Sequence, residues 1–227
     1  MKLFDDWPKR YDEWFETPIG KFVERYERDL LFELLTPKEG EALLDAGCGT
    51  GVFTINLLKM GVRVMGLDIS LHMLKRASEK AKTYPFHALT GDMRHLPFGD
   101  NSFEKVISVT AIEFIKDGLA PVRELFRVTK PGGVVAVATL NSLSPWAYQR
   151  KIEAKKAPSS IFKDVFFRSP EELLSLAPAS HGIVKTAIHF ENNEDPTYIK
   201  KIPGIEKDGY SKDLDTGAFV VARWEKF

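Results

Sequence analysis

The chain has 227 residues, of which 44% are hydrophobic and 28% are charged, as is usual for a globular protein with a packed core. Its 32 basic residues balance 32 acidic ones, so no overall positive charge favours a nucleic acid as partner. No apolar run approaches the roughly 18 residues of a membrane span, and the first residues lack the apolar core of a signal peptide. The single cysteine, Cys48, excludes an internal disulfide and favours the reducing cytoplasm as the compartment.

The first 35 residues predict a helical segment that is rich in aromatic side chains. Tyr11 and Trp14 lie three residues apart, which puts them on one face of a helix. Such a face either closes over a ligand as a lid or packs into the core of the fold, and the sequence leaves both possibilities open.

From residue 42 onward, short β-type runs alternate with helical runs. The strand candidates are, in chain order, ALLDA, VRVMGLD, FHALTGD, KVISVT, VVAVATL, IVKTAIHF and AFVVARWE. Ser70 stands at the N-cap position of a helical run, and the KPGG sequence of residues 130–133 predicts a break before the fifth strand. Strands that alternate with helices predict an α/β fold with a mostly parallel sheet and helices on both faces.

Two later stretches interrupt this alternation. Residues 141–168 contain a polar helix and a loop, and residues 191–216 are polar and punctuated by proline and glycine. Loops of this length are often functional in compact domains. We expect both to be additions to a single domain of residues 1–227.

Three glycines, Gly47, Gly49 and Gly51, stand at every second position directly after the first strand. Ligands of open parallel sheets bind outside the carboxyl ends of the strands, where glycines let a ligand touch the backbone and the next helix offers unpaired N–H groups. Two ligand classes fit such a turn, dinucleotides and S-adenosylmethionine. Tight packing of the turn is the alternative.

Two aspartates at the ends of the next strands narrow this choice. Asp68 comes 17 residues after Gly51 and can accept the ribose hydroxyls of an adenosine, which both ligand classes contain. Asp92 ends the third strand and can accept the amino group of adenine, beside a backbone N–H for a ring nitrogen. Each aspartate taken alone could instead cap a helix or a turn, but the combination favours S-adenosylmethionine.

Five motifs in chain order resemble those of the class I S-adenosylmethionine-dependent methyltransferases, and more narrowly the ubiquinone and menaquinone biosynthesis branch: LLDAGCGTG, GLDIS, GDMRHLPF, NSFEKVISVTAIEFI and ELFRVTKPGGVVAVATLN. FFRSPEELLSL and, more loosely, YDEWFETPIG also resemble segments of this family. The resemblance implies a Rossmann-like, doubly wound fold. Residues 1–35 would be a helical lid, residues 36–140 the cofactor-binding core, and residues 141–227 the acceptor side with the last strands.

The resemblance also implies ten positions that contact S-adenosylmethionine. They are Asp45, Gly47, Cys48, Gly49, Gly51 and Thr110 around the methionine part, Asp68 at the ribose, and Ile69, Asp92 and Met93 at the adenine. Asp45 would orient the glycine turn near the ammonium group, and Cys48 would be a small filler rather than a reactive thiol.

The acceptor side is less clearly specified. Glu113 and Phe114 stand where this family more often has a pair that contains histidine; Glu113 is the best-placed carboxylate for a general base, and a surface glutamate is the alternative. Trp146 and Tyr148 follow the fifth strand, where the family builds its acceptor pocket, and aromatic lining suits a small, flat or lipophilic acceptor. A solvated helix face explains the basic run of residues 150–156.

The histidines and acidic residues show no metal-ligand spacing, so no metal site is predicted. We therefore expect a cytoplasmic S-adenosylmethionine-dependent methyltransferase that acts on a small molecule, not on nucleic acid. A non-catalytic S-adenosylmethionine-binding module and, with less support, an NAD(P)-dependent oxidoreductase are the alternatives. The sequence specifies neither the acceptor nor the oligomeric state.

Overall fold

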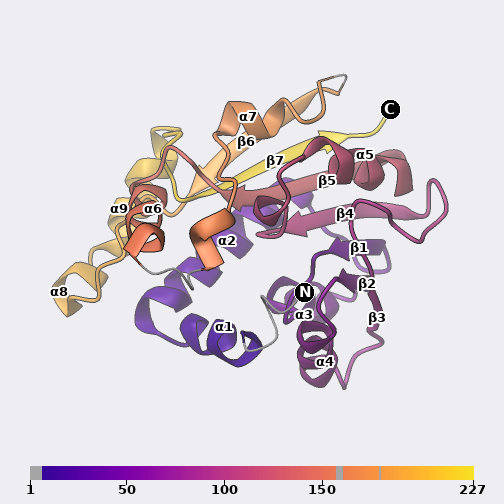
Figure 1. Cartoon of the computed structure of the whole chain (residues 1–227), viewed down its shortest axis with the longest axis horizontal. Helices are drawn as coiled ribbons and strands as arrows, with labels where there is room; N and C mark the ends of the chain where they lie inside the picture. The colour runs from indigo at the N-terminus through magenta and orange to yellow at the C-terminus, as the bar shows by residue number, and fades with distance from the viewer. Residues whose placement is uncertain (1–6, 157–160, 179) are drawn as a thin grey trace.

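The computed structural model describes residues 7–156, 161–178 and 180–227, and seven strands within these ranges form one sheet in the order β3-β2-β1-β4-β5-β7-β6 (Figure 1). The strands are β1 (Ala42–Ala46), β2 (Arg63–Asp68), β3 (His87–Thr90), β4 (Phe103–Val109), β5 (Thr129–Leu140), β6 (Gly182–Ala187) and β7 (Phe219–Glu225). Strands β1 to β5 are parallel, and β7 runs antiparallel to its neighbours β5 and β6. The predicted mostly parallel, seven-stranded sheet is confirmed.

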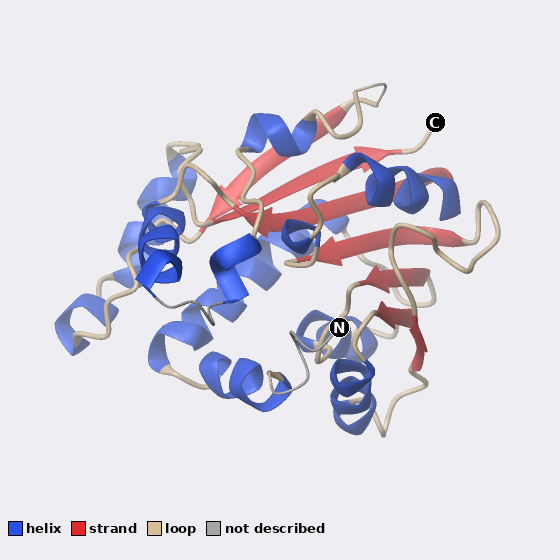
Figure 2. Ribbon diagram, in the orientation of Figure 1, coloured by secondary structure: helices blue, strands red, loops and turns tan. Residues whose placement is uncertain are grey.

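Helices lie on both sides of this sheet (Figure 2). The helical elements are α1 (Pro8–Phe15), α2 (Pro18–Leu35), α3 (Val52–Lys59), α4 (Leu71–Lys80), α5 (Leu119–Val128), α6 (Pro145–Lys156), α7 (Pro170–Leu174), α8 (Pro196–Ile199), α9 (Ile202–Ser211), and the 3-10 turns η2 (Ile112–Phe114) and η3 (Ile161–Asp164). None of the helices in the described part of the chain is long and apolar enough to cross a membrane.

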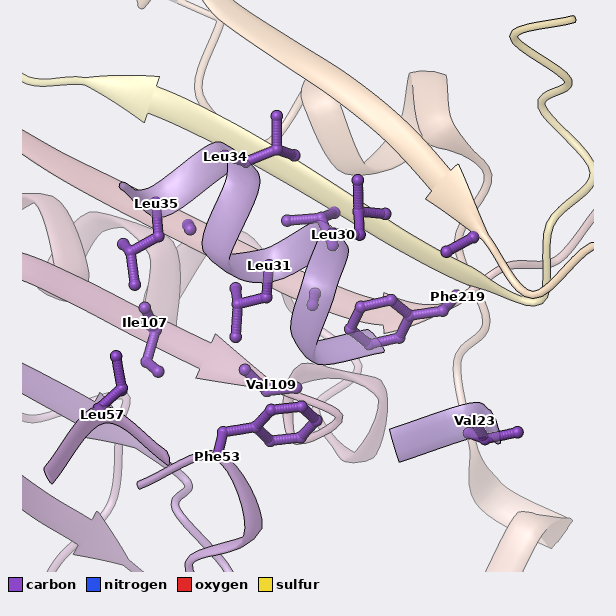
Figure 3. Packing of buried hydrophobic residues seen from close by; sticks show 14 of the residues in the cluster. Val23, Leu30, Leu31, Leu34, Leu35, Phe53, Leu57, Ile107, Val109 and Phe219 are labelled. Atoms are coloured by element: carbon purple, nitrogen blue, oxygen red, sulfur yellow. The ribbon is translucent and has the colours of Figure 1, made fainter. Parts of the chain in front are cut away.

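The strands alternate side chains between two hydrophobic clusters, one on each face of the sheet. In β4, Ile107 and Val109 belong to one cluster and Val106 to the other, because successive side chains of a strand point to opposite faces. On the first face, the leucines of α2 pack over β4 and against Phe53 and Leu57 of α3 (Figure 3). Both faces of the central strands are therefore covered, which is why their sequences read as nearly continuous apolar runs.

The two N-terminal helices pack closely against each other at Gly20. A Cβ at this position would lie 2.0 Å from the carbonyl oxygen of Trp14, so only glycine fits there. Thr17 caps α2 by accepting the N–H of Gly20 at 3.0 Å. This joint fixes the angle at which α1 leaves α2 and extends toward α4, beyond the carboxyl ends of the parallel strands (Figure 1).

Strand β5 differs from the sequence prediction at its start. The strand begins at Thr129 and includes the KPGG residues, with Gly132 at a φ of 74° and a register shift against β4 between Phe103 and Lys105. The glycines therefore form an irregularity within the strand rather than a break before it. Residues 1–6 of the predicted lid and residues 157–160 of the predicted acceptor side lie outside the described residues.

Candidate functional site

One cavity of about 1120 Å³ lies at the carboxyl ends of the parallel strands, between the sheet and helices α1 and α6. It joins two groups of residues, which we call the cofactor half and the acceptor half. The cofactor half is lined by Asp45, Gly47, Cys48, Gly49, Asp68, Ile69, Asp92, Met93 and Thr110, and the acceptor half by Trp14, Glu27, Glu113, Phe114, Trp146, Gln149, Arg150, Glu153, Phe162 and Asn192.

The three glycines of the turn all have positive φ angles, of 82° at Gly47, 53° at Gly49 and 77° at Gly51. Their surroundings differ. A Cβ on Gly47 would lie 2.4 Å from the Cβ of Ala111, whereas a Cβ on Gly49 would meet nothing within 4 Å. Gly47 is therefore needed for packing, and Gly49 presents bare backbone to the open cavity, as a turn that contacts a ligand would require.

Asp68 connects the end of β2 to this turn. Its Oδ2 accepts the N–H of Gly49 at 2.8 Å, and its Oδ1 accepts the N–H of Ser70 at 2.8 Å. Burial raises the pKa of Asp68, and these backbone hydrogen bonds lower it in part. A carboxylate has about four acceptor positions, so each oxygen of Asp68 can accept one more hydrogen bond from a ligand.

Asp45 lies deeper, beneath the turn. It accepts the hydroxyl of Thr54 at 2.6 Å, and burial raises its pKa to about 7. Cys48 is buried beside it, and burial raises the pKa of its thiol well above the ordinary value, so the thiol is present as the weakly reactive neutral form.

The residues predicted at the adenine lie on the loops after β2 and β3. Ile69 is exposed, Met93 is buried, and both line the cavity. Both oxygens of Asp92 accept hydrogen bonds from the Arg94 guanidinium, which holds the pKa of Asp92 below its usual value. A ligand that donates to Asp92 must therefore compete with Arg94.

Helix α1 is held over the cofactor half by one aspartate. Asp12 accepts hydrogen bonds from Thr50 at 2.7 Å, Arg76 at 2.7 Å and Lys80 at 3.0 Å. Burial raises the pKa of Asp12, but these hydrogen bonds outweigh it and lower the pKa overall. Because Thr50 belongs to the glycine turn, this cluster, the Asp12 latch, couples α1 to the predicted cofactor site.

The same helix brings Tyr11 into the cavity. Its hydroxyl lies near the side chain of Thr110, which lowers the pKa of Tyr11 in part and has a φ of 47° directly after β4. Burial and the charges of Glu27 and Glu113 raise the pKa of Tyr11, so it is neutral at physiological pH. Trp14, on the same face, also lines the cavity. The two aromatic side chains thus line the cavity and also pack against the core cluster, while closure over a ligand stays a prediction.

Glu113 is buried rather than a surface residue. It is 1% exposed, accepts the hydroxyl of Thr139 at 3.1 Å, and burial raises its pKa to about 7. The turn η2 that carries it is fixed by Arg168, whose guanidinium donates to the carbonyl oxygens of Ile112 at 3.1 Å and Ile115 at 2.9 Å. Arg168 lies in the FFRSPEELLSL motif, but nothing in that motif distinguishes it from other charged residues.

Sequence reasoning missed six of the ten lining residues of the acceptor half: Glu27, Gln149, Arg150, Glu153, Phe162 and Asn192. In the sequence, Glu27 is one of several charged residues of α2 and suggests a surface position. In the structure it is 5% exposed and lines the cavity. Arg150 belongs to the basic run that we attributed to a solvated helix face, and this interpretation is wrong for Arg150. Its guanidinium lies in the cavity, 5.2 Å from the ring centroid of Trp146 and 5.1 Å from that of Phe162.

The two aromatic residues predicted at the acceptor pocket have different positions. Trp146 is buried, lines the cavity and donates its indole N–H to the carbonyl oxygen of Phe190 at 2.6 Å. Tyr148 is 70% exposed and is not among the lining residues, so its placement in the pocket is wrong. The reason is helical geometry, because Trp146 and Arg150 are one turn apart and Tyr148 lies on the opposite face.

Phe114 lines the cavity next to Glu113, as expected for this position. Within the described residues, no group of three or more histidine, cysteine, aspartate or glutamate side chains has the geometry to hold a metal ion.

Comparisons with known proteins agree with this geometry. Residues 44–137 match the family described as "Methyltransferase domain". The chain is 36% identical over 141 residues to a demethylmenaquinone methyltransferase of Corynebacterium kroppenstedtii, covering 62% of this chain and 59% of that protein. It is 40% identical over 101 residues to a malonyl-[acyl-carrier protein] O-methyltransferase of Serratia marcescens, covering 44% of this chain and 39% of that protein.

The fold is similar to solved structures over almost its whole length. A structure described as an S-adenosylmethionine-dependent methyltransferase, possibly a histamine N-methyltransferase, of Thermotoga maritima has a TM-score of 0.75 at 24% identity, covering 99% of this chain and 98% of that chain. This likeness establishes the fold. The chain spans only 59% of the length of the demethylmenaquinone methyltransferase above, so the relatives leave the acceptor half unassigned.

Proposed function

We propose that the protein is an S-adenosylmethionine-dependent methyltransferase of the menaquinone and ubiquinone branch that acts on a small molecule; the match of residues 44–137 to the methyltransferase-domain family supports this. The single observation that carries the proposal is that one cavity connects Gly49 and Asp68 to Glu113 and Trp146. A methyl donor and its acceptor must meet in one shared space, and this cavity is large enough to provide it.

The residues present fit S-adenosylmethionine. Gly49 offers bare backbone to open space, and both oxygens of Asp68 have acceptor capacity left for ribose hydroxyls. When bound, S-adenosylmethionine supplies a methyl carbon that the adjacent sulfonium already activates for displacement. We assign the methionine part to Asp45, Gly47, Cys48, Gly49, Gly51 and Thr110, the ribose to Asp68, and the adenine to Ile69, Asp92 and Met93.

The chain's own residues then align the methyl donor with the acceptor and limit the access of water to them. Helix α1, held by the Asp12 latch, covers the cavity with Tyr11 and Trp14. Arg168 fixes the turn that carries Glu113, so the carboxylate is positioned before the acceptor arrives. Glu113 is the proposed general base, and its pKa of about 7 leaves a useful fraction ionised at neutral pH.

Two alternatives are less well supported. A non-catalytic binding module would need no acceptor pocket, whereas Trp146, Arg150, Phe162 and Asn192 line one beside the cofactor half. A dinucleotide-dependent oxidoreductase would favour the all-parallel 3-2-1-4-5-6 sheet, whereas here the antiparallel β7 lies between β5 and β6.

The remaining sequence predictions belong to this proposal. We treat residues 1–227 as a single domain and place the protein in the cytoplasm, since one free, buried cysteine suits a reducing compartment. The known relatives methylate chemically different acceptors by their names, a quinone precursor and a carrier-bound malonyl group. Their names therefore do not identify the acceptor here.

The test is isothermal titration of the protein with S-adenosylmethionine, S-adenosylhomocysteine and NAD. The proposal expects the two adenosyl sulfur compounds to bind and NAD not to bind. Binding should be followed by incorporation of a labelled methyl group from S-adenosylmethionine into one fraction of a small-molecule extract. If NAD binds and the adenosyl sulfur compounds do not, the oxidoreductase alternative replaces this proposal.

A further inference from the structure

The acceptor half of the cavity contains more negative than positive charge. Of the residues assigned above to this half, Glu27, Glu113 and Glu153 are acidic and Arg150 is basic, while Arg10 and Lys116 line the same cavity outside this set. Among the described residues, no carboxylate oxygen lies within ion-pair distance of the Arg150 guanidinium, which lies instead over the rings of Trp146 and Phe162. The carboxylates of this half are therefore not neutralised by direct pairing.

Glu27 is the least satisfied of these groups. It comes from the middle of α2, is 95% buried at 5% exposure, and faces the cavity. No described residue donates a hydrogen bond to it, whereas Glu113 accepts one from Thr139 at 3.1 Å. The Glu27 oxygens are not fully enclosed by the described residues. They face the cavity, where a ligand can donate hydrogen bonds to them.

The chemistry of the surroundings indicates what that ligand carries. Two carboxylates that face one space are best satisfied by a group with several N–H donors and a positive charge. Arg150 shows that aromatic walls of this half already hold one cation over their faces, and the exposed side of Trp14 adds another ring. An anionic acceptor would instead meet Glu27, Glu113 and Glu153 at close quarters.

We propose that the methyl acceptor is an organic amine whose nitrogen donates to the Glu27 carboxylate, with Glu113 as the second acceptor and the aromatic side chains around its carbon skeleton. This inference rests on the proposed function and names the substrate class of the same site. It also argues against a quinone or a carboxylate as the acceptor, because neither group would be stabilised by the unpartnered glutamate Glu27.

The same placement of Glu27 identifies the group that accepts the proton released by the amine. An ammonium group must lose one proton before its nitrogen lone pair can attack a methyl carbon, so an N–H bond breaks and an O–H bond forms on the glutamate. Glu27 is faced by Tyr11 of α1, Glu24 of α2, Glu113 of η2 and Arg150 of α6. Burial, Glu113 and Glu24 raise its pKa, Arg150 lowers it, and the result is about 8. Its carboxylate is thus a stronger base than an ordinary glutamate.

The experiment measures binding rather than turnover. The protein is first saturated with S-adenosylhomocysteine, which has no methyl group to transfer, and is then titrated calorimetrically with matched compounds at pH 8.5. Each of three skeletons, phenylethyl, indolylethyl and butyl, is used with an amine, a hydroxyl or a carboxylate at its end. The proposal expects the amine of at least one skeleton to bind about tenfold or more tightly than its hydroxyl and carboxylate counterparts.

Two variants test whether Glu27 is responsible for the preference for the amine. Glu27→Gln should lower the affinity for the preferred amine by about tenfold or more and leave that for S-adenosylhomocysteine unchanged. Glu16→Gln is the matched control, since Glu16 is exposed between α1 and α2 and pairs with Lys21 at the surface. It should change neither affinity.

The outcomes are distinguishable from failure of the proposed function. If S-adenosylhomocysteine does not bind to the unsubstituted protein, the methyltransferase proposal itself fails. If it binds but no skeleton shows a preference for the amine, or if Glu27→Gln keeps the preference, the amine proposal is overturned. The series on the unsubstituted protein decides the question even if the Glu27 variant does not fold.

Discussion

The two halves of the cavity are built in different ways. The cofactor half consists of turns at the ends of adjacent strands, and its main contact joins Gly49 to Asp68, only 19 positions apart. The acceptor half consists of side chains from α1, α2, η2, α6, η3 and the loop between β6 and α8, so that Trp14, Glu27, Glu113 and Arg150 meet from across most of the chain. Backbone geometry forms the first half, and convergence of distant helices forms the second.

This difference decides how each half tolerates change. A substitution in the cofactor half acts on backbone that a ligand must touch, and we expect large losses of cofactor affinity. A substitution in the acceptor half acts on one side chain among several, and we expect changed specificity with the cofactor affinity kept. The predictions below are ordered from the largest expected effect to the smallest.

Gly49→Ala should have the largest effect. The new methyl group would enter the open space where the cofactor is proposed to lie against the backbone, and we expect an affinity loss for S-adenosylhomocysteine on the order of a hundredfold. Gly40→Ala is the matched control, because Gly40 also has a positive φ, of 81°, with nothing within 4 Å of its Cβ, but lies in an exposed turn away from the cavity. Calorimetric titration of both variants checks this. An equal loss in both would show that backbone strain, not contact with the ligand, is responsible.

Asp68→Ala should lower the same affinity by about tenfold or more, because a half-buried carboxylate that accepts two hydroxyls is worth more than about 1.5 kcal/mol. Asp92→Ala should have a smaller effect, since Asp92 is already engaged by Arg94 and is more exposed. Titrations with S-adenosylhomocysteine rank the two. If Asp68→Ala stays within a factor of about two of the unsubstituted protein, the ribose assignment is wrong.

The sequence predicted the sheet and the places of the cofactor-half residues because both depend on local patterns. Alternating apolar runs specify the strands, and the GCGTG turn specifies positive φ angles that only glycine adopts without strain. The roles of these residues toward a ligand are still predictions.

The residues of the acceptor half could not be predicted from local sequence patterns in the same way. Glu27 lies on a helix with charged neighbours on most sides, and only the approach of η2 and α6 makes it a buried cavity residue. Tyr148 shows the opposite error, because an aromatic residue two positions from Trp146 points away on the helix. Proximity in sequence does not reveal which face of a helix the rest of the fold covers.

Glu27→Gln should also make the fold less sensitive to pH. The pKa of Glu27 is about 8 in the folded protein against 4.5 for an ordinary glutamate, so folding takes up a proton between these values. Stability therefore falls as pH rises from about 4.5 to 8 and stays lower above this range. The glutamine variant cannot ionise, so its free energy of unfolding relative to that of the unsubstituted protein should grow between pH 4 and pH 9 by an amount on the order of 1 kcal/mol or more, and its Tm advantage should grow with it.

Thermal unfolding at the two pH values measures this, with Glu16→Gln as the control that should show no such growth. A Tm difference for Glu27→Gln that is the same at pH 4 and pH 9 would show that Glu27 titrates normally and that its burial is not maintained in solution.

Asp12→Ala should have the smallest effect, a loss of cofactor affinity of about threefold to tenfold with faster dissociation, because it releases helix α1 without touching the ligand. Glu79→Ala is the control, since Glu79 pairs with the same Arg76 on the exposed face of α4. Stopped-flow measurement of S-adenosylhomocysteine release compares them. Equal release rates in the Asp12 variant and the unsubstituted protein would mean that α1 is not a lid.

The central claim, that one cavity holds the methyl donor at the strand ends and opens from it to the acceptor, is tested most directly by a crystal structure with S-adenosylhomocysteine. We predict the ribose at Asp68, the amino-acid end along Gly47 and Gly49, and the sulfur facing Glu113 and Trp146. A ligand bound elsewhere, or one whose sulfur faces away from the acceptor half, would contradict the account.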